Sequence, residues 1–141
     1  MGYRVLHAAD AHWRPSNQMQ VENTDLAKQL EASSLGARLW RLRPGQASTR
    51  HRHREQEELY VVMEGTGRMH VDDEALTLET GSAVLVGPGS VRQVFNDTQD
   101  EALWLVAGAP PEPANTKEMS EEDLEFLYPD GPKAMPPELQ G

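Results

Sequence analysis

The sequence predicts a single all-β domain, and two observations carry that prediction. The middle of the chain consists of short segments rich in β-forming residues, each ended by turn residues such as Pro44-Gly45 and Thr80-Gly81. Many short strands separated by such turns are typical of a β-sandwich or β-barrel. The chain has 141 residues, the length of one ordinary domain, which is enough to form a hydrophobic core without disulfides.

Residues 1–36 are expected to form a segment that packs on the barrel as a strand followed by a helix. Residues 3–8 have the composition of a short first strand. A short helix is expected over residues 25–31, where Asn23 or Thr24 supplies the N-cap.

The barrel itself is predicted over residues 37–108, and its first strand lies between Ser33 and Gly45. Side chains of a strand alternate between two faces, so residues of equal parity share a face. Trp40 and Leu42 are expected to face the core, while Arg41 and Arg43 face water or a partner.

The residues after Gly45 carry the most chemistry. His51 and His53 are two positions apart, so in an extended backbone both imidazoles point to the same side. Glu58 arrives on the following strand. Two imidazoles and one carboxylate are a suitable ligand set for a divalent transition metal. The alternating arginines of this stretch face the other side: Arg50, Arg52 and Arg54.

Residues 57–63 form the strongest β segment, and the segment is largely apolar on both faces. One face holds Glu58, Tyr60 and Val62; the other holds Leu59, Val61 and Met63. A strand that is apolar on both faces is covered on both faces. The second cover is either another sheet of the same chain or a partner subunit, and we expect a homodimer.

The remaining strands follow at short intervals and lead into a different type of sequence. These strands are expected at 68–72, 75–79, 83–86, 91–96 and 101–107. Residues 109–141 begin with a proline-rich connector and continue into a short helix, which Ser120 caps and which extends through Tyr128. An irregular tail completes the chain.

The pattern of glycines, histidines and Glu58 resembles the first motif of the cupin superfamily. That motif is a Gly, five residues, His-x-His, three or four residues, Glu, six residues and a second Gly. All of its positions are occupied here, in the longer spacing, by Gly45, His51, His53, Glu58 and Gly65.

The second cupin motif is matched only in part. It consists of a Gly, five residues, Pro-x-Gly, two residues, His, three residues and Asn. Gly81, Gly89 and Asn96 match in register, whereas Gly87 stands at the proline position and Arg92 at the histidine position.

The resemblance implies a six-to-eight-stranded jelly-roll barrel, or double-stranded β-helix, that is often dimeric. It also implies a metal, of the Fe, Mn, Zn or Ni kind, held by His51, His53, Glu58 and the histidine of the second motif. Similar proteins include dioxygenases, isomerases, lyases and sugar-binding proteins. The resemblance therefore implies a bound small molecule but leaves open whether the chain is an enzyme, and of which type.

Arg92 at the usual histidine position leaves two hypotheses for the site. In the first, His51, His53 and Glu58 hold the metal and Arg92 binds a substrate carboxylate or phosphate. In the second, Arg92 forms a buried ion pair with Glu58, and the site binds a small acid or sugar without metal. Tyr60 is expected to be a core tyrosine with one hydroxyl contact, and with Arg92 it is a candidate for substrate binding.

The composition excludes several classes of function. The chain contains no cysteine, which excludes zinc–thiolate sites and a cysteine nucleophile. The formal net charge of −10 argues against nucleic acid or an anionic membrane as a partner. No segment has the apolar length of a membrane span, and the first residues lack the apolar core of a signal peptide, so we expect a cytoplasmic protein.

Overall fold

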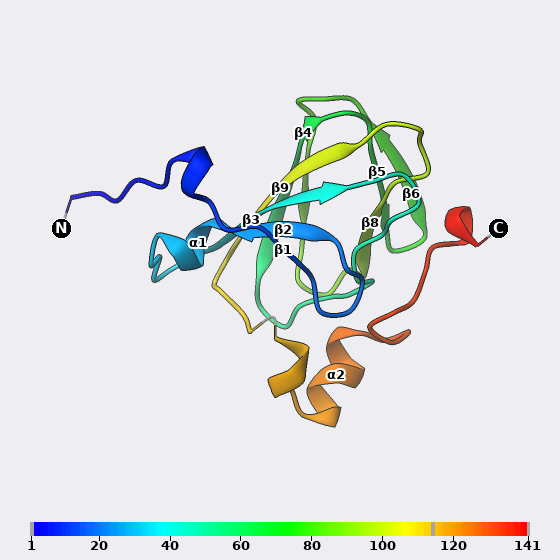
Figure 1. Cartoon of the computed structure of the whole chain (residues 1–141). Coiled ribbons are helices and arrows are strands. Elements are labelled where there is room, and N and C mark those ends of the chain that lie inside the picture. Colours follow the sequence, from blue (N-terminus) through cyan, green and yellow to red (C-terminus); the bar gives the residue numbers. More distant parts are fainter. Residues whose placement is uncertain (1, 114, 141) are drawn as a thin grey trace.

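Two antiparallel sheets, seen in a computed structural model that describes residues 2–113 and 115–140, face each other and form the body of the molecule (Figure 1). The larger sheet has the strand order β1-β2-β3-β9-β4-β7 and the smaller one β6-β5-β8. The strands are β1 (Arg14–Pro15), β2 (Glu22–Asp25), β3 (Gly36–Leu42), β4 (Glu57–Glu64), β5 (Gly67–Val71), β6 (Glu74–Leu78), β7 (Ala83–Val86), β8 (Arg92–Phe95) and β9 (Ala102–Ala109). This arrangement confirms a mostly β fold and is consistent with a double-stranded β-helix.

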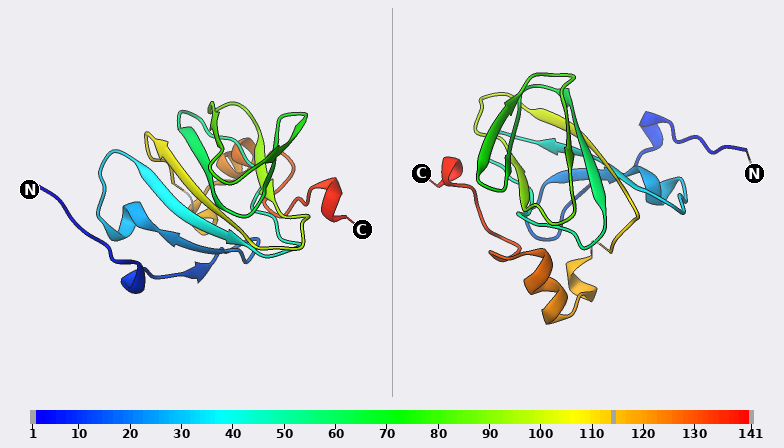
Figure 2. Two further views of the ribbon diagram at one scale, coloured as in Figure 1. Left: turned by 90° about the horizontal axis from the view of Figure 1, so that it is seen from above. Right: turned by 180° about the vertical axis from the view of Figure 1, so that it is seen from behind.

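The helices are short and lie outside the two sheets (Figures 1 and 2). α1 (Leu26–Gln29) follows β2, and α2 (Glu121–Leu127) lies beyond one end of the barrel. The described residues also include short 3-10 turns at Ala8–Asp10, Thr116–Glu118 and Pro137–Leu139. Among the described residues, no helix has the length and apolar character needed to cross a membrane.

The hydrophobic core lies between the two sheets. The larger sheet contributes buried side chains such as Leu42, Val62 and Trp104, and the smaller sheet contributes Met69 and Val94. Burial of each such side chain stabilises the fold by about 1.5–3 kcal/mol. The parity argument for β3 is confirmed, because Leu42 is fully buried.

The N-terminal segment differs from the prediction in two places. No strand forms over residues 3–8; Tyr3 and Val5 are exposed, and this stretch pairs with no strand of the sheet. The helix is also shorter than expected and is capped by Asp25, whose carboxylate accepts a hydrogen bond from the Lys28 amide. Asn23 and Thr24, the expected caps, instead belong to β2, where they pair with β3.

The segment with the two histidines is extended but is not a ladder strand. His51 makes one isolated bridge to Arg92, with both backbone N–H···O bonds formed, and the His53 amide donates to the Pro88 carbonyl. The alternation on which the sequence argument rested survives because it depends on an extended backbone and not on sheet pairing. On the other side, the Arg52 amide donates to the Leu127 carbonyl, which fastens this segment to α2.

β4 lies in the interior of the larger sheet, between β9 and β7, and its two faces differ. Glu58, Tyr60 and Val62 are buried. Leu59 and Met63, on the opposite face, are 40% and 45% exposed. Of the two expected covers, a second sheet of the same chain is not found over this face among the described residues. A partner subunit remains the proposal for that cover.

If two copies associate through this face, a charge placed on it breaks the dimer. We expect the parent chain to have the mass of a dimer by light scattering, and Leu59→Glu or Leu85→Glu to shift it to a monomer. Leu85 is suitable because it is 62% exposed on the neighbouring strand β7. Val5→Glu, at an exposed position in the N-terminal segment, is the matched control and leaves the mass unchanged. A monomeric parent would contradict the proposal.

Candidate metal centre and its cavity

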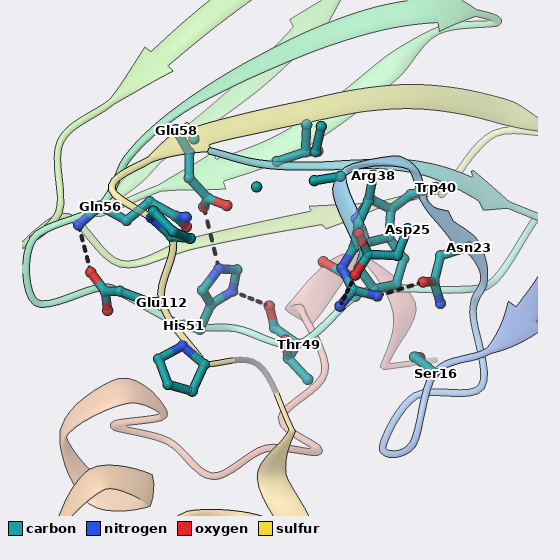
Figure 3. Close-up of a pocket in the computed structure, with 18 of the residues that line it drawn as sticks. Ser16, Asn23, Asp25, Arg38, Trp40, Thr49, His51, Gln56, Glu58 and Glu112 are labelled. Carbon is teal, nitrogen blue, oxygen red and sulfur yellow. Dashed lines mark hydrogen bonds and ion pairs between the residues drawn. The ribbon is translucent and has the colours of Figure 1, made fainter. Parts of the chain in front are cut away.

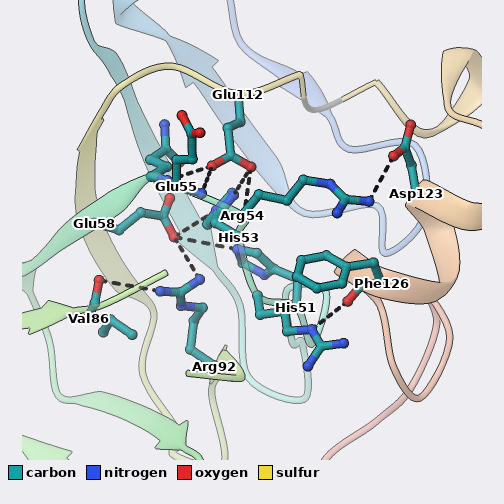
Figure 4. A network of polar contacts seen from close by, with 12 residues as sticks. His51, His53, Arg54, Glu55, Glu58, Val86, Arg92, Glu112, Asp123 and Phe126 are labelled. Atoms are coloured by element: carbon teal, nitrogen blue, oxygen red, sulfur yellow. Dashed lines mark hydrogen bonds and ion pairs between the residues drawn. The ribbon is translucent and has the colours of Figure 1, made fainter. Parts of the chain in front are cut away.

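The three predicted metal ligands meet at one point. His51, His53 and Glu58 each present a ligand atom, and these atoms all lie within 4.8 Å of one another. The Glu58 carboxylate oxygen Oε1 is 3.5 Å from Nε2 of His51 and 3.1 Å from Nε2 of His53. Figure 4 shows the carboxylate at the centre of these contacts. The spacing of the first cupin motif therefore becomes a cluster in space.

The other ring nitrogens fix the orientation of both imidazoles. Nδ1 of His51 lies 3.0 Å from the Thr49 carbonyl oxygen, and Nδ1 of His53 lies 3.4 Å from the Glu112 carboxylate. These partners only accept hydrogen bonds, so each Nδ1 carries a proton and each ring turns its Nε2 toward Glu58. Metal-binding histidines are held in the same way.

Three potential metal-ligand atoms face one another at short distances. They are the Nε2 atoms of the two histidines and a carboxylate oxygen of Glu58, and Nε2 of His53 is buried without a hydrogen-bond partner among the described residues. A divalent cation satisfies all three atoms at once. Without a cation, the arrangement requires protonated imidazoles beside the carboxylate. The residues present therefore fit a metal.

The electrostatics of the cluster keep Glu58 charged. Burial opposes ionisation of this carboxyl, but hydrogen bonds from His51 and His53 outweigh burial and hold its pKa well below the usual range. An ionised carboxylate is the form that binds a metal.

Tyr60 is a hydrogen-bond donor to Glu58. Its side chain is almost fully buried, and its hydroxyl donates to Oε1 of Glu58 at 2.8 Å. Burial, together with the negative charge of Glu58, raises the pKa of Tyr60 well above the ordinary value. The phenol therefore stays protonated. Tyr60 also lines the adjoining cavity, so it lies where a bound molecule can reach it.

Arg92 lies beside Glu58 but is shielded from solvent. Its Nη1 is 3.8 Å from Oε1 of Glu58, and its Nη2 donates to the Gly87 carbonyl at 2.6 Å. Nε and Nη1 have no hydrogen-bond partner in the part of the chain that the structure describes. Because the side chain is 0% exposed, a ligand in the cavity contacts Arg92 only if Arg92 or Glu58 moves. The guanidinium is thus anchored mainly by a loop carbonyl and only loosely by the carboxylate.

Glu112 is a site residue that the sequence argument missed. It lies in the connector after β9, and its carboxylate accepts hydrogen bonds from the amides of Arg54, Glu55 and Gln56 as well as facing His53. Burial opposes its ionisation, but the three amide donors outweigh burial and lower its pKa. No motif marks this residue; its only sequence signal is a carboxylate between the prolines of a connector that follows the barrel.

A cavity of about 990 Å³ opens next to the metal centre. In Figure 3, Glu58, His51 and Glu112 lie toward one end, and a second polar group lies toward the other. That second group consists of Asn23, Asp25, Arg38 and Trp40. The sequence predicted Asn23 at a helix cap and did not single out Arg38. Its only clue to Arg38 was shared parity with Trp40 and Leu42.

The chain belongs to the cupin family. The family model for the cupin domain matches residues 38–108, half of the chain, and contains the whole of both motifs. A comparison with curated protein sequences gives no match.

Solved structures of similar shape carry the names of several different proteins. A sugar phosphate isomerase of the cupin superfamily from Silicibacter pomeroyi is 25% identical, with a TM-score of 0.68, and the match covers 77% of this chain and 76% of that one. A predicted oxalate decarboxylase from Thermotoga maritima is 18% identical (TM-score 0.67, 77% and 100% covered). KdgF from Halomonas sp. is 15% identical (TM-score 0.67, 77% and 94% covered). At these identities, the last two similarities concern the fold alone.

The contacts of Glu112 predict a role in metal affinity. We expect Glu112→Gln to weaken Zn²⁺ binding by about 10–100-fold, because His53 loses the carboxylate that orients it. The measurement is competition with a chromophoric chelator, with thermal unfolding recorded on the same samples. Glu118→Gln, an exposed acid in the same connector, is the control. Unchanged Zn²⁺ affinity in a folded Glu112→Gln protein would show that Glu112 only fastens the connector.

Proposed function

We propose that this cupin binds a divalent transition metal through His51, His53 and Glu58, and that a small polar or anionic molecule occupies the adjoining cavity. The convergence of three acceptor atoms on one point carries this proposal. The neighbouring cavity supports it, because its volume lies within the range of small-molecule sites.

The residues around the proposed metal centre have different roles. A metal held there supplies Lewis acidity, or a centre of oxygenase, isomerase or lyase chemistry. Glu58, as a ligand, does not act as a general base. Tyr60 donates a hydrogen bond to the Glu58 carboxylate and so keeps that carboxylate oriented. The two imidazoles are held by their Nδ1 contacts, which leaves the cavity side of the centre for a ligand.

Metal analysis of protein purified without a His tag tests this proposal directly. We expect close to one metal per chain in the parent and a large loss in Glu58→Gln and in His51→Ala. His70→Ala is the matched control, because His70 lies on β5 and contacts Glu138 outside the cluster. Sub-stoichiometric metal in a parent that was never exposed to chelator would overturn the proposal.

The second candidate function is a metal-free site for a small acid or sugar. It is favoured by one observation: Nη1 of Arg92 lies within ion-pair distance of Glu58, at 3.8 Å. A fixed positive charge beside a cation site opposes metal binding, and burial strengthens that opposition. In this hypothesis the positive charge of Arg92 stands in for the metal, and His51 and His53 contact the ligand.

Replacing Arg92 separates the two hypotheses. In the metal-free case, Arg92→His creates or greatly strengthens a metal site, because it adds a third imidazole as a fourth ligand and removes the charge. Arg92→Gln removes the charge without adding an imidazole and distinguishes the two contributions. Metal affinities are measured by chelator competition, and thermal unfolding checks that the variants fold. A parent that binds metal as tightly as Arg92→His contradicts the metal-free hypothesis.

A further inference from the structure

We propose that the end of the cavity opposite the metal centre is a subsite for the anionic group of the bound molecule, built on Arg38 and Trp40. This inference rests on the proposed function, since the other end of the same molecule is taken to reach the metal centre. The ligand class is a hydroxylated carboxylate or phosphate ester of roughly sugar size.

Arg38 lies on the face of β3 that points into the barrel. Arg38, Trp40 and Leu42 share one face of β3, and that face is turned toward the barrel interior, where Leu42 is fully buried. Arg38 and Trp40 both line the cavity. Figure 3 shows their side chains at the end away from Glu58. A charged side chain on an inward face is unfavourable unless it is paired or used.

The Arg38 guanidinium is held in place by two contacts and keeps N–H groups free for a ligand. Its Nη1 donates to the Asn23 side-chain oxygen at 2.8 Å, and its Nη2 is 3.0 Å from the Asp25 carboxylate. Asn23 is itself 1% exposed and donates to the backbone carbonyls of Arg14 and Val21. A guanidinium carries five N–H groups, so three remain for a ligand. The side chain keeps 28% of its surface exposed.

The cavity wall at this end is mainly positive in charge. The wall residues from the N-terminal part of the chain, His12 to Trp40, include three formal cations and a single carboxylate, Asp25. The cations are Arg14, Lys28 and Arg38. In a chain with a formal charge of −10, this local excess favours an anionic group.

The shape of the site is also suited to a cyclic molecule. Trp40 offers a flat indole beside the guanidinium, whose central carbon lies 5.9 Å from the ring centroid. Such a ring packs against the less polar face of a cyclic molecule while Arg38 binds the charged substituent. A cavity of about 990 Å³ is large for an acid of a few atoms and suits a molecule that reaches both ends.

The test uses the full chain, with its metal content measured on the same samples. Glucuronate and glucose 6-phosphate are the probes, and glucose is the uncharged control; binding is measured by calorimetry and by tryptophan fluorescence. We expect at least one anion to bind, and glucose to bind at least about ten-fold more weakly, since a charged hydrogen bond is lost. The tighter of the two anions identifies the group as carboxylate or phosphate.

Variants assign the binding to Arg38. Arg38→Gln should weaken anion binding by about ten-fold or more while the metal content stays at the parent level. Arg41→Gln is the matched control, because Arg41 lies on the same strand but pairs outside the cavity with Glu64 and Glu101. If Arg38→Gln unfolds because Asp25 loses its partner, the double variant Arg38→Gln/Asp25→Asn removes the pair together.

The outcomes separate this inference from the proposed function. It is overturned if neither anion binds, if glucose binds as tightly as the anions, or if folded Arg38→Gln retains the parent affinity. If the same samples contain metal, each of these results overturns the anion subsite but not the proposed metal centre. Absence of metal from the parent overturns the proposed metal centre, whatever the anions do.

Discussion

The buried carboxylate of Glu58 is the group on which the rest of the site depends. The carboxylate oxygen Oε1 has four neighbours at distances between 2.8 and 3.8 Å: two imidazoles, a phenol and a guanidinium. A carboxylate with 11% of its side chain exposed remains ionised only with such partners. The strand β4 makes this possible, because its place inside the larger sheet fixes Glu58 and Tyr60 on one inward face. The fold thus places one buried negative charge beside two imidazoles, a phenol and a guanidinium.

The metal end of the cavity could be predicted from the sequence because its geometry is local. The strand period alone places His51 and His53 on a common side, and the spacing of the first cupin motif adds Glu58 from the following strand. The predicted strand at the two histidines was a local error, because this segment is extended but is not a ladder strand. The prediction of a common side holds, because it depends only on an extended backbone. The position of Arg92 next to Glu58 also followed from the register of the second motif. The motif does not show which groups hold the guanidinium of Arg92. In the structure it is held by a hydrogen bond to the Gly87 carbonyl.

The remaining site residues could not be found in this way because their contacts are long-range. Glu112 reaches amides of residues 54–56 only after the chain has completed the barrel and turned back. Arg38 is fixed by Asn23 and Asp25, which form part of a strand pair that propensity alone did not indicate. The preference of Asn for helix caps favoured the wrong local structure there, and pairing with β3 overrode that preference. The open outer face of β4 is a further case, since sequence shows an apolar face but not what covers it.

The two ends of the cavity therefore have different origins in the chain, and this has a consequence for function. The end with the proposed metal centre is formed by His51, His53 and Glu58, within the two cupin motifs, residues 45–96. The far end is built from β2, α1 and the beginning of β3, of which only the last falls in the matched region. In the proposed function the metal is therefore held by the common barrel, while the proposed anion subsite depends on an N-terminal segment at one edge of the sheet. Structural similarity to the sugar phosphate isomerase concerns the shared barrel, and a shared barrel does not by itself determine which molecule is bound.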